Sequence, residues 1–139
     1  MNVLIDTNVI LDVLLEREPH VEAAARLFAL VDNGRVTGSI CATTATTIYY
    51  IAAKSFGGRR ARDQVHALLG LFEVAPVDRD VLDSALDIDF PDYEDAVLHE
   101  AACAAGATVI VTRDRDDFVN STIPALDPIE FLAVVAASE

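Results

Sequence analysis

Three groups of acidic residues occupy positions where carboxylates could together hold a divalent cation. Asp6 follows the apolar run of residues 3–5, and Asp114 comes shortly after the apolar run of residues 109–111. The third group, Asp-Tyr-Glu-Asp at residues 92–95, opens an alanine-rich segment. An ionised carboxylate is costly to bury unless a cation or several hydrogen-bond donors receive it. The acidic groups therefore predict a metal site.

The chemistry expected of these acids follows from their mutual repulsion. Carboxylates that lie close together raise the pKa of one another, and a bound divalent cation removes that cost. A ligand set of oxygen atoms, without cysteine or histidine nearby, favours Mg²⁺ or Mn²⁺ over zinc. Such an ion lowers the pKa of a bound water and neutralises phosphate charge during a displacement reaction.

Each acidic group also has a purely structural interpretation. Asp6 could cap the helix that follows it. Asp92 and Asp95 could complement the dipole of the helix that they begin, and Asp114 could be a loop residue in solvent. For each residue taken alone, the structural interpretation is preferred. Taken together, with two of the groups at strand ends, the acidic residues favour the metal site.

Short apolar runs alternate with segments of helical periodicity, a pattern that predicts an α/β protein with a mostly parallel sheet of four or five strands. The first strand, residues 2–5, is expected to be buried on both faces because its apolar residues are continuous. Asp127-Pro128-Ile129-Glu130 is typical of a helix start. The other expected strands are residues 36–40, 73–77, 108–112 and 123–126, and the other expected helices are residues 8–16, 20–32, 43–54, 59–71, 78–87 and 91–105.

The strand pattern predicts where the acidic residues meet. In an open parallel sheet, ligands bind beyond the carboxyl ends of the strands, at the switch in strand order. Asp6 and Asp114 follow strands and should both point to that edge. Asp95 reaches the same edge only if the loop that enters its helix crosses there.

Composition limits the class of protein. A chain of 139 residues with 53% hydrophobic residues is expected to form one domain, residues 1–139. A domain of this size can bury a stable core without disulfides or a structural metal. No apolar run is long enough to span a bilayer and no signal peptide precedes the first strand, so a cytoplasmic protein without membrane contact is expected. Cys41 and Cys103 lack metal-ligand spacing and are expected to be buried free thiols.

The charge is strongly negative but unevenly distributed. A net charge of −13 argues against non-specific adhesion to nucleic acid. Four of the ten basic residues nevertheless fall close together, as Lys54, Arg59, Arg60 and Arg62. This basic cluster could hold phosphates of a nucleic acid, or it could be the solvated start of a helix, and the sequence does not separate the two.

The acidic motifs resemble those of the PIN domain family. The resemblance rests on Val-Leu-Ile-Asp-Thr-Asn at residues 3–8, the helix that carries Asp95, and Val-Thr-Arg-Asp-Arg-Asp-Asp-Phe at residues 111–118. It extends over essentially the whole chain and is strongest to small VapC-like toxins. It implies a Rossmann-like α/β/α sandwich and a ribonuclease that uses Mg²⁺ or Mn²⁺ to activate water against an RNA phosphodiester.

The resemblance also assigns expected roles by position. Asp6 and Asp95 match the principal metal ligands of the family, and Asp114 matches the acidic residue after the fourth strand. Asn8 and Thr112 match polar residues that help to shape the site.

One position departs from the family pattern. The family usually has glutamate early in the helix after the second strand, and Thr47 stands at that position. A neutral hydroxyl cannot replace the charge of a carboxylate, although threonine-rich versions occur in one PIN subgroup. Asp92 or Glu94 could compensate, since Asp92 lies one helical turn from Asp95, and Asp117 is the next candidate.

The leading hypothesis is a metal-dependent endoribonuclease that is the toxin of a type II toxin–antitoxin pair, with the basic cluster guiding the RNA. The resemblance implies a cognate antitoxin that clasps the site groove, and a homodimer. The alternative, motivated by Thr47, is a non-catalytic or weakly active PIN module that binds RNA or a protein. Phosphoryl chemistry of the haloacid-dehalogenase or response-regulator type is disfavoured, because position 8 is Asn and Lys54 is the only lysine.

Overall fold

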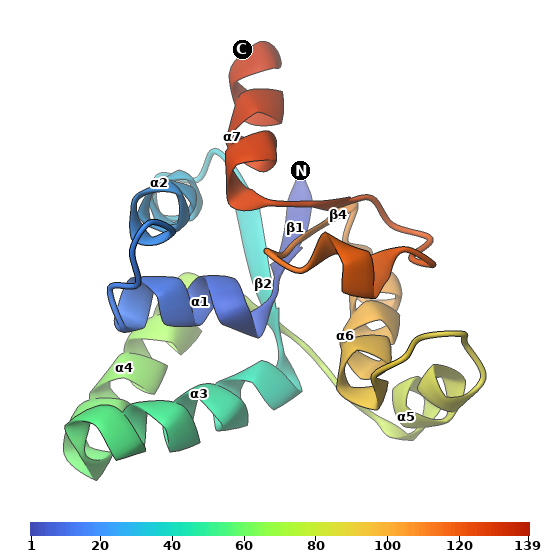
Figure 1. The fold of residues 1–139 in the computed structure, drawn as a ribbon, viewed down its shortest axis with the longest axis horizontal. Helices are drawn as coiled ribbons and strands as arrows, with labels where there is room; N and C mark the ends of the chain where they lie inside the picture. Colours follow the sequence, from blue (N-terminus) through green and yellow to red (C-terminus); the bar gives the residue numbers. More distant parts are fainter.

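The computed structural model describes residues 1–139 and contains a five-stranded, all-parallel sheet flanked by seven helices (Figure 1). The strand order is β3-β2-β1-β4-β5. This architecture confirms the predicted α/β class, and the fifth strand joins the sheet. The strands are β1 (Asn2–Ile5), β2 (Thr37–Cys41), β3 (Glu73–Ala75), β4 (Val109–Val111) and β5 (Ala125–Leu126). The helices are α1 (Thr7–Leu14), α2 (Val21–Asp32), α3 (Ala42–Phe56), α4 (Gly58–Leu71), α5 (Arg79–Leu86), α6 (Tyr93–Ala104) and α7 (Pro128–Ala137), with a 3₁₀ helix η1 (Arg115–Phe118).

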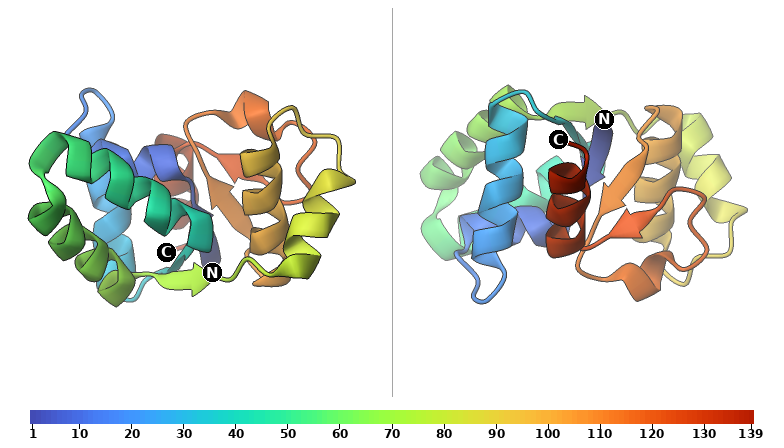
Figure 2. Two further views of the ribbon diagram at one scale, coloured as in Figure 1. Left: turned by 90° about the horizontal axis from the view of Figure 1, so that it is seen from below. Right: turned by 90° about the horizontal axis from the view of Figure 1, so that it is seen from above.

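The sheet is covered on both faces, as the continuous apolar residues of β1 predicted. Successive side chains of a strand point to opposite faces. Val3 and Ile5 therefore pack into one core with α1, α2, α3, α4 and α7, while Leu4 packs into a second core with α5 and α6. Figures 1 and 2 show the two groups of helices on either side of the sheet. All three side chains are fully buried.

The order of the strands creates a crevice at the carboxyl edge of the sheet. The chain adds β2 and β3 on one side of β1, then returns through α5 and α6 to add β4 and β5 on the other side. The switch in strand order therefore lies between β1 and β4. The backbone N–H of Asp6 donates to the carbonyl of Val111 at 2.9 Å and holds the two strand ends together.

Several local predictions are confirmed at the level of hydrogen bonds. α7 begins with a capping box, in which the Asp127 carboxylate accepts from the Glu130 backbone and the Glu130 carboxylate accepts from the Asp127 backbone. At the start of α6, Asp92 is the N-cap and accepts from the backbone N–H of Asp95 at 2.9 Å. None of the helices is both long and apolar enough to cross a membrane.

Three local expectations were wrong. β3 ends at Ala75 rather than residue 77, because Pro76 has no N–H to continue the ladder. α1 ends at Leu14 rather than residue 16, since Glu16 adopts a left-handed backbone with φ of 50°. Cys41 is buried as expected, but Cys103 is exposed because it lies on the solvent side of α6.

Candidate metal centre

A pocket of about 300 Å³ lies at the carboxyl ends of β1 and β4, where the strand order changes. Its lining comes from α1, the loop after α1, the start of α3, the start of α6 and the loop after β4. We call it the acidic pocket because five carboxylates line it. Those carboxylates belong to Asp6, Asp92, Glu94, Asp95 and Asp114.

Asp6 caps α1 and also lines the acidic pocket. It is the N-cap of α1, where its Oδ1 accepts from the backbone N–H of Thr7 at 2.7 Å. Its Oδ2 accepts from the hydroxyl of Thr112 at 2.8 Å, and the residue is only 7% exposed. The hydrogen bond from Thr7 begins the helix, and together with the bond from Thr112 it holds the carboxylate at the edge of the pocket.

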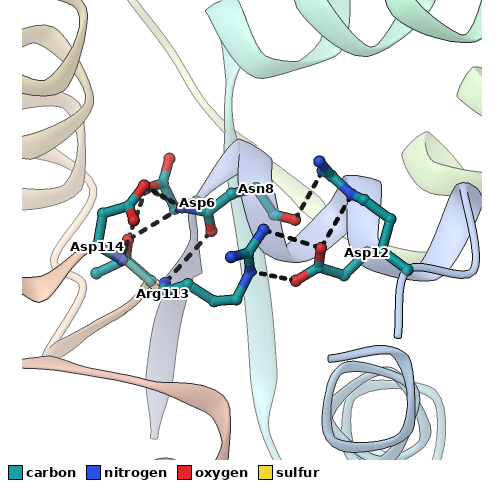
Figure 3. Close-up of polar contacts among 7 residues, drawn as sticks. Asp6, Asn8, Asp12, Arg113 and Asp114 are labelled. Atoms are coloured by element: carbon teal, nitrogen blue, oxygen red, sulfur yellow. Dashed lines mark hydrogen bonds and ion pairs between the residues drawn. The ribbon is translucent and has the colours of Figure 1, made fainter. Parts of the chain in front are cut away.

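Asn8 and Thr112 connect Asp6 to Asp114, and Figure 3 shows Asn8 together with the two carboxylates. The side-chain amide of Asn8 donates to Asp114 Oδ2 at 3.0 Å, and the backbone N–H of Asp114 donates to Thr112 Oγ1 at 3.0 Å. Thr112 is fully buried, whereas Asp114 is exposed. The two polar residues predicted to shape the site therefore contact its acidic residues directly.

Two carboxylates of the acidic pocket, Asp6 and Asp95, have raised pKa values. Burial raises the pKa of Asp95 to about 7, and the charges of Asp6, Asp92, Asp117 and Glu94 act in the same direction. Burial also raises the pKa of Asp6, although hydrogen bonds at its carboxylate partly oppose the effect. A divalent cation would relieve both costs.

The free energy of unfolding of the metal-free protein should depend on pH through Asp95. The folded-state pKa of about 7 lies above the ordinary value of 3.8, so the folded protein keeps a proton that the unfolded chain has released. Stability from this group is present below about pH 4 and is lost as the pH rises through 7. Because Asp95 is only half-buried, screening by solvent limits the effect to the order of 1 kcal/mol.

Urea unfolding in EDTA at about pH 4.5 and about pH 7.5 measures this effect. Asp95→Asn should reduce the loss of stability between the two pH values, whereas the exposed control Asp63→Asn on α4 should retain the wild-type loss. The same pH dependence in both variants would show that Asp95 titrates normally.

The donor chemistry of the acidic pocket fits a hard divalent cation, since only oxygen atoms are offered by its carboxylates, hydroxyls and amide. The carboxylates are more widely spaced than the ligands of one bound ion. The one group of three ligand side chains whose ligand atoms all lie within 4.8 Å is His99, Glu100 and Cys103 on α6.

The His99 group is a satisfied hydrogen-bond network. His99 is 3% exposed, and its Nε2 accepts from the backbone N–H of Thr122 at 3.1 Å. The proton therefore lies on Nδ1, which donates to the Glu100 carboxylate at 2.8 Å. The lone pair that a metal would need is already used, although Cys103 lies one helical turn away with Sγ 3.7 Å from Nε2.

Several predicted site residues lie outside the lining of the acidic pocket. Thr47 is half-buried one turn further along α3, whereas Thr43 and Thr44 line the pocket instead. Thr44 Oγ1 lies 2.9 Å from Thr7 Oγ1, a hydrogen bond that joins the starts of α3 and α1. Asp117, in η1, acts on the pocket only through its charge, which raises the pKa of Asp95.

The basic cluster also lies away from the pocket. Lys54 is ten residues after Thr44 in α3, a rise of about 15 Å along the helix. The other members lie at the start of α4, where the guanidinium of Arg60 stacks 4.0 Å from the centroid of the Phe56 ring. Arg62 lies over the ring of Tyr49, at 6.0 Å from its centroid. These arginines are therefore partly engaged by aromatic residues of the α3–α4 hairpin.

Besides Thr43 and Thr44, two charged residues beside the acidic pocket were missed from the sequence, Asp12 and Arg17. Asp12, on α1, is fully buried and accepts two hydrogen bonds from the guanidinium of Arg113, from Nε at 2.6 Å and from Nη2 at 3.1 Å (Figure 3). Arg17 approaches the same carboxylate from the loop after α1, with Nε 3.1 Å from Oδ1. Asp12 carried the same signal as Asp6, an acidic residue inside an apolar run, but no strand end drew attention to it.

Comparison with known proteins gives this arrangement a family. The family model described as PIN domain matches residues 2–116. Ribonuclease VapC1 of Aquifex aeolicus is 22% identical over 134 residues, covering 93% of this chain and 92% of that protein. The α/β/α fold with acidic residues at the switch in strand order, together with this match, shows that the chain belongs to the PIN domain family.

Solved structures of VapC toxins have a similar fold. The VapBC2 complex of Rickettsia felis, bound to a DNA fragment from its promoter, contains a chain with a TM-score of 0.70 and 14% identity, covering 91% of this chain and 98% of that chain. VapC20 of Mycobacterium tuberculosis, a toxin that cleaves the sarcin–ricin loop, has a TM-score of 0.62 and 15% identity, covering 78% of this chain and 86% of that chain.

Proposed function

We propose that this protein is a metal-dependent endoribonuclease that hydrolyses phosphodiester bonds of RNA, and that it is the toxin of a type II toxin–antitoxin pair. The observation that carries the proposal is the acidic pocket, where Asp6, Asp95 and Asp114 meet at the switch in strand order. The likeness to VapC ribonucleases and to toxin–antitoxin complexes supports the same activity.

Asp6, Asp95 and Asp114 are the residues that would hold Mg²⁺ or Mn²⁺, with Asp92 and Glu94 beside them. A bound ion would supply a water of lowered pKa and would neutralise charge on the phosphate. The chain's own contribution is to hold the carboxylates in place. Thr112 and the Thr7 backbone fix Asp6, and the Asn8 amide orients Asp114.

The partners follow from the same proposal. RNA is the substrate, and a cognate antitoxin covers the acidic pocket, as the solved toxin–antitoxin complexes of similar fold support. The protein acts as a homodimer of a single PIN domain in the cytoplasm. The basic cluster, formed by Lys54, Arg59, Arg60 and Arg62, guides RNA at a distance from the cleavage site.

The test is cleavage of a mixed-sequence RNA by the purified protein. Wild type should cut the RNA with Mn²⁺ or Mg²⁺ and should be inactive in EDTA, because the carboxylates alone repel phosphate. Zn²⁺ at the same concentration should support less cleavage, since the pocket offers oxygen ligands only. Equal cleavage with and without EDTA would refute the metal-dependent mechanism.

A second function is favoured by one observation, the threonine at position 47 where the family usually has glutamate. We infer from it a weakly active or non-catalytic PIN module that binds RNA or a protein partner. The same experiment separates the two functions if RNA binding is measured beside cleavage. Binding of RNA without cleavage at any Mn²⁺ concentration would favour the binding module.

A further inference from the structure

We propose that Arg17 forms an anion subsite at the edge of the acidic pocket and binds a backbone phosphate of the RNA. The inference rests on the proposed function, because it assumes an RNA strand in the pocket. Arg17 is the only basic residue among those that line the pocket, and its side chain is 38% exposed. The basic cluster lies too far along α3 to reach the same phosphate.

Hydrogen bonds in the loop between α1 and α2 hold the backbone of Arg17 in place. Its backbone N–H donates to the carbonyl of Asp12 at 3.0 Å, and its carbonyl accepts from the backbone N–H of His20 and of Val21. Its side chain extends beside the buried Asp12 and places Nη2 at 3.5 Å from the backbone oxygen of Asn8. A guanidinium held in this way loses little conformational freedom when it binds an anion.

The charges around Asp12 leave one positive charge without a counterion. Asp12 carries one negative charge and faces two guanidinium groups, and Arg113 already makes two hydrogen bonds to it. Arg17 Nε lies 3.1 Å from Asp12 Oδ1, but this ion pair does not have hydrogen-bond geometry, and the buried Nε has no other partner. One positive charge is therefore not neutralised by Asp12.

The free donors of Arg17 match a phosphate. A guanidinium carries five N–H donors in a planar fork, and in this structure the only hydrogen bond that Arg17 donates through its side chain goes to the backbone oxygen of Asn8. Arg17 forms no ion pair with any of the five carboxylates of the acidic pocket. A polyanion that enters a pocket lined by carboxylates needs a cation on the protein as well as a bound metal, and Arg17 is placed to supply it.

The alternative role for Arg17 is to clamp the loop after α1 against Asp12. The two roles differ in what they do to RNA affinity. Arg17→Gln removes the charge and keeps most of the length of the side chain, while Arg17→Lys keeps the charge. Arg26→Gln is the matched control, because Arg26 is 70% exposed on α2 and its change in net charge is identical.

Affinity is measured by fluorescence anisotropy with a labelled 12-nucleotide RNA in Ca²⁺, a hard cation suited to oxygen ligands, and a gel afterwards verifies that the RNA is intact. Arg17→Gln should raise the Kd about tenfold and lower the slope of log Kd against log salt by about 0.7, the value for one phosphate contact on a single strand. Arg17→Lys should recover part of the affinity. Ca²⁺ affinity and Tm should stay at the wild-type values.

The proposal is overturned if Arg17→Gln matches Arg26→Gln in Kd and salt slope. It is also overturned if the loss of affinity comes with a lower Tm and is not recovered by Arg17→Lys, since that result describes a structural clamp. The binding measurement needs no turnover, so a failure to cleave RNA in the Mn²⁺ assay would refute the ribonuclease, while the binding data would still decide the role of Arg17. A wild type that does not bind RNA refutes the subsite directly.

Discussion

Replacing Asp6 with asparagine is expected to lower metal-dependent RNA cleavage by about 10³-fold, equivalent to about 4 kcal/mol of transition-state stabilisation. Loss of a residue that only hydrogen-bonds to a metal ligand already lowers metal affinity or activity by about 10- to 100-fold. Asp6 is expected to be a ligand itself, so its loss should have a larger effect. The substitution removes the charge without removing the oxygen that accepts from Thr7. Asparagine is as good an N-cap as aspartate, so α1 should still begin at Thr7.

This substitution separates the chemical role of Asp6 from its structural role. Initial rates should be measured over a range of Mn²⁺ concentrations, with metal affinity determined by calorimetry and stability by thermal unfolding. Asp6→Asn should weaken Mn²⁺ binding and abolish cleavage while leaving Tm close to wild type. The control Asp63→Asn changes the net charge equally and should cleave normally. Wild-type rates for Asp6→Asn would remove Asp6 from the metal centre.

Asp12→Asn is expected to destabilise the folded protein by about 3 kcal/mol, the typical effect of removing one partner from a buried ion pair. The Asp12 carboxylate is completely buried and is the only anion that contacts the guanidinium groups of Arg113 and Arg17. Without it, two partly buried positive charges face each other. The hydrogen bonds from Arg113 also join α1 to the loop after β4, so their loss should loosen the wall of the acidic pocket.

The measurement is urea unfolding in metal-free buffer at neutral pH. Asp83→Asn is a suitable control, because Asp83 is exposed and its pair with Arg79 at 3.8 Å should contribute less than 1 kcal/mol. A loss below about 1 kcal/mol for Asp12→Asn would mean that solvent reaches the two arginines easily. In that case the ion pair is not what holds the loop after β4 in place.

Much of the fold could be predicted because its signals are local. The continuous apolar residues of β1 predicted burial on both faces, and the cap at Asp127 predicted the start of α7. The predicted ends of strands and helices were less accurate where a single residue ends the element, as Pro76 does for β3 and Glu16 does for α1. A single backbone conformation or a missing N–H outweighs the periodicity of the surrounding residues.

The candidate site was predictable to the extent that it lies at strand ends. Asp6 and Asp114 were expected at one edge of the sheet, and both line the acidic pocket. Asp12 and Arg17 were not expected, because Asp12 lies inside an apolar run but away from any strand end, and its main partner Arg113 is 101 residues away in the sequence. Thr44 rather than Thr47 faces the pocket, since the side of α3 that meets α1 depends on how the two helices pack.

The amino-acid sequence alone determined the identity of the acidic residues, the elements that carry them and the likeness to PIN domains. These features depend on residue type, spacing and hydrogen bonds between near neighbours. Tertiary structure decided the strand order, which brings Asp114 beside Asn8 across 106 residues, and the pairing of Asp12 with Arg113 across 101. It also raised the pKa of Asp95 to about 7, because burial and neighbouring charges exist only once the chain has folded.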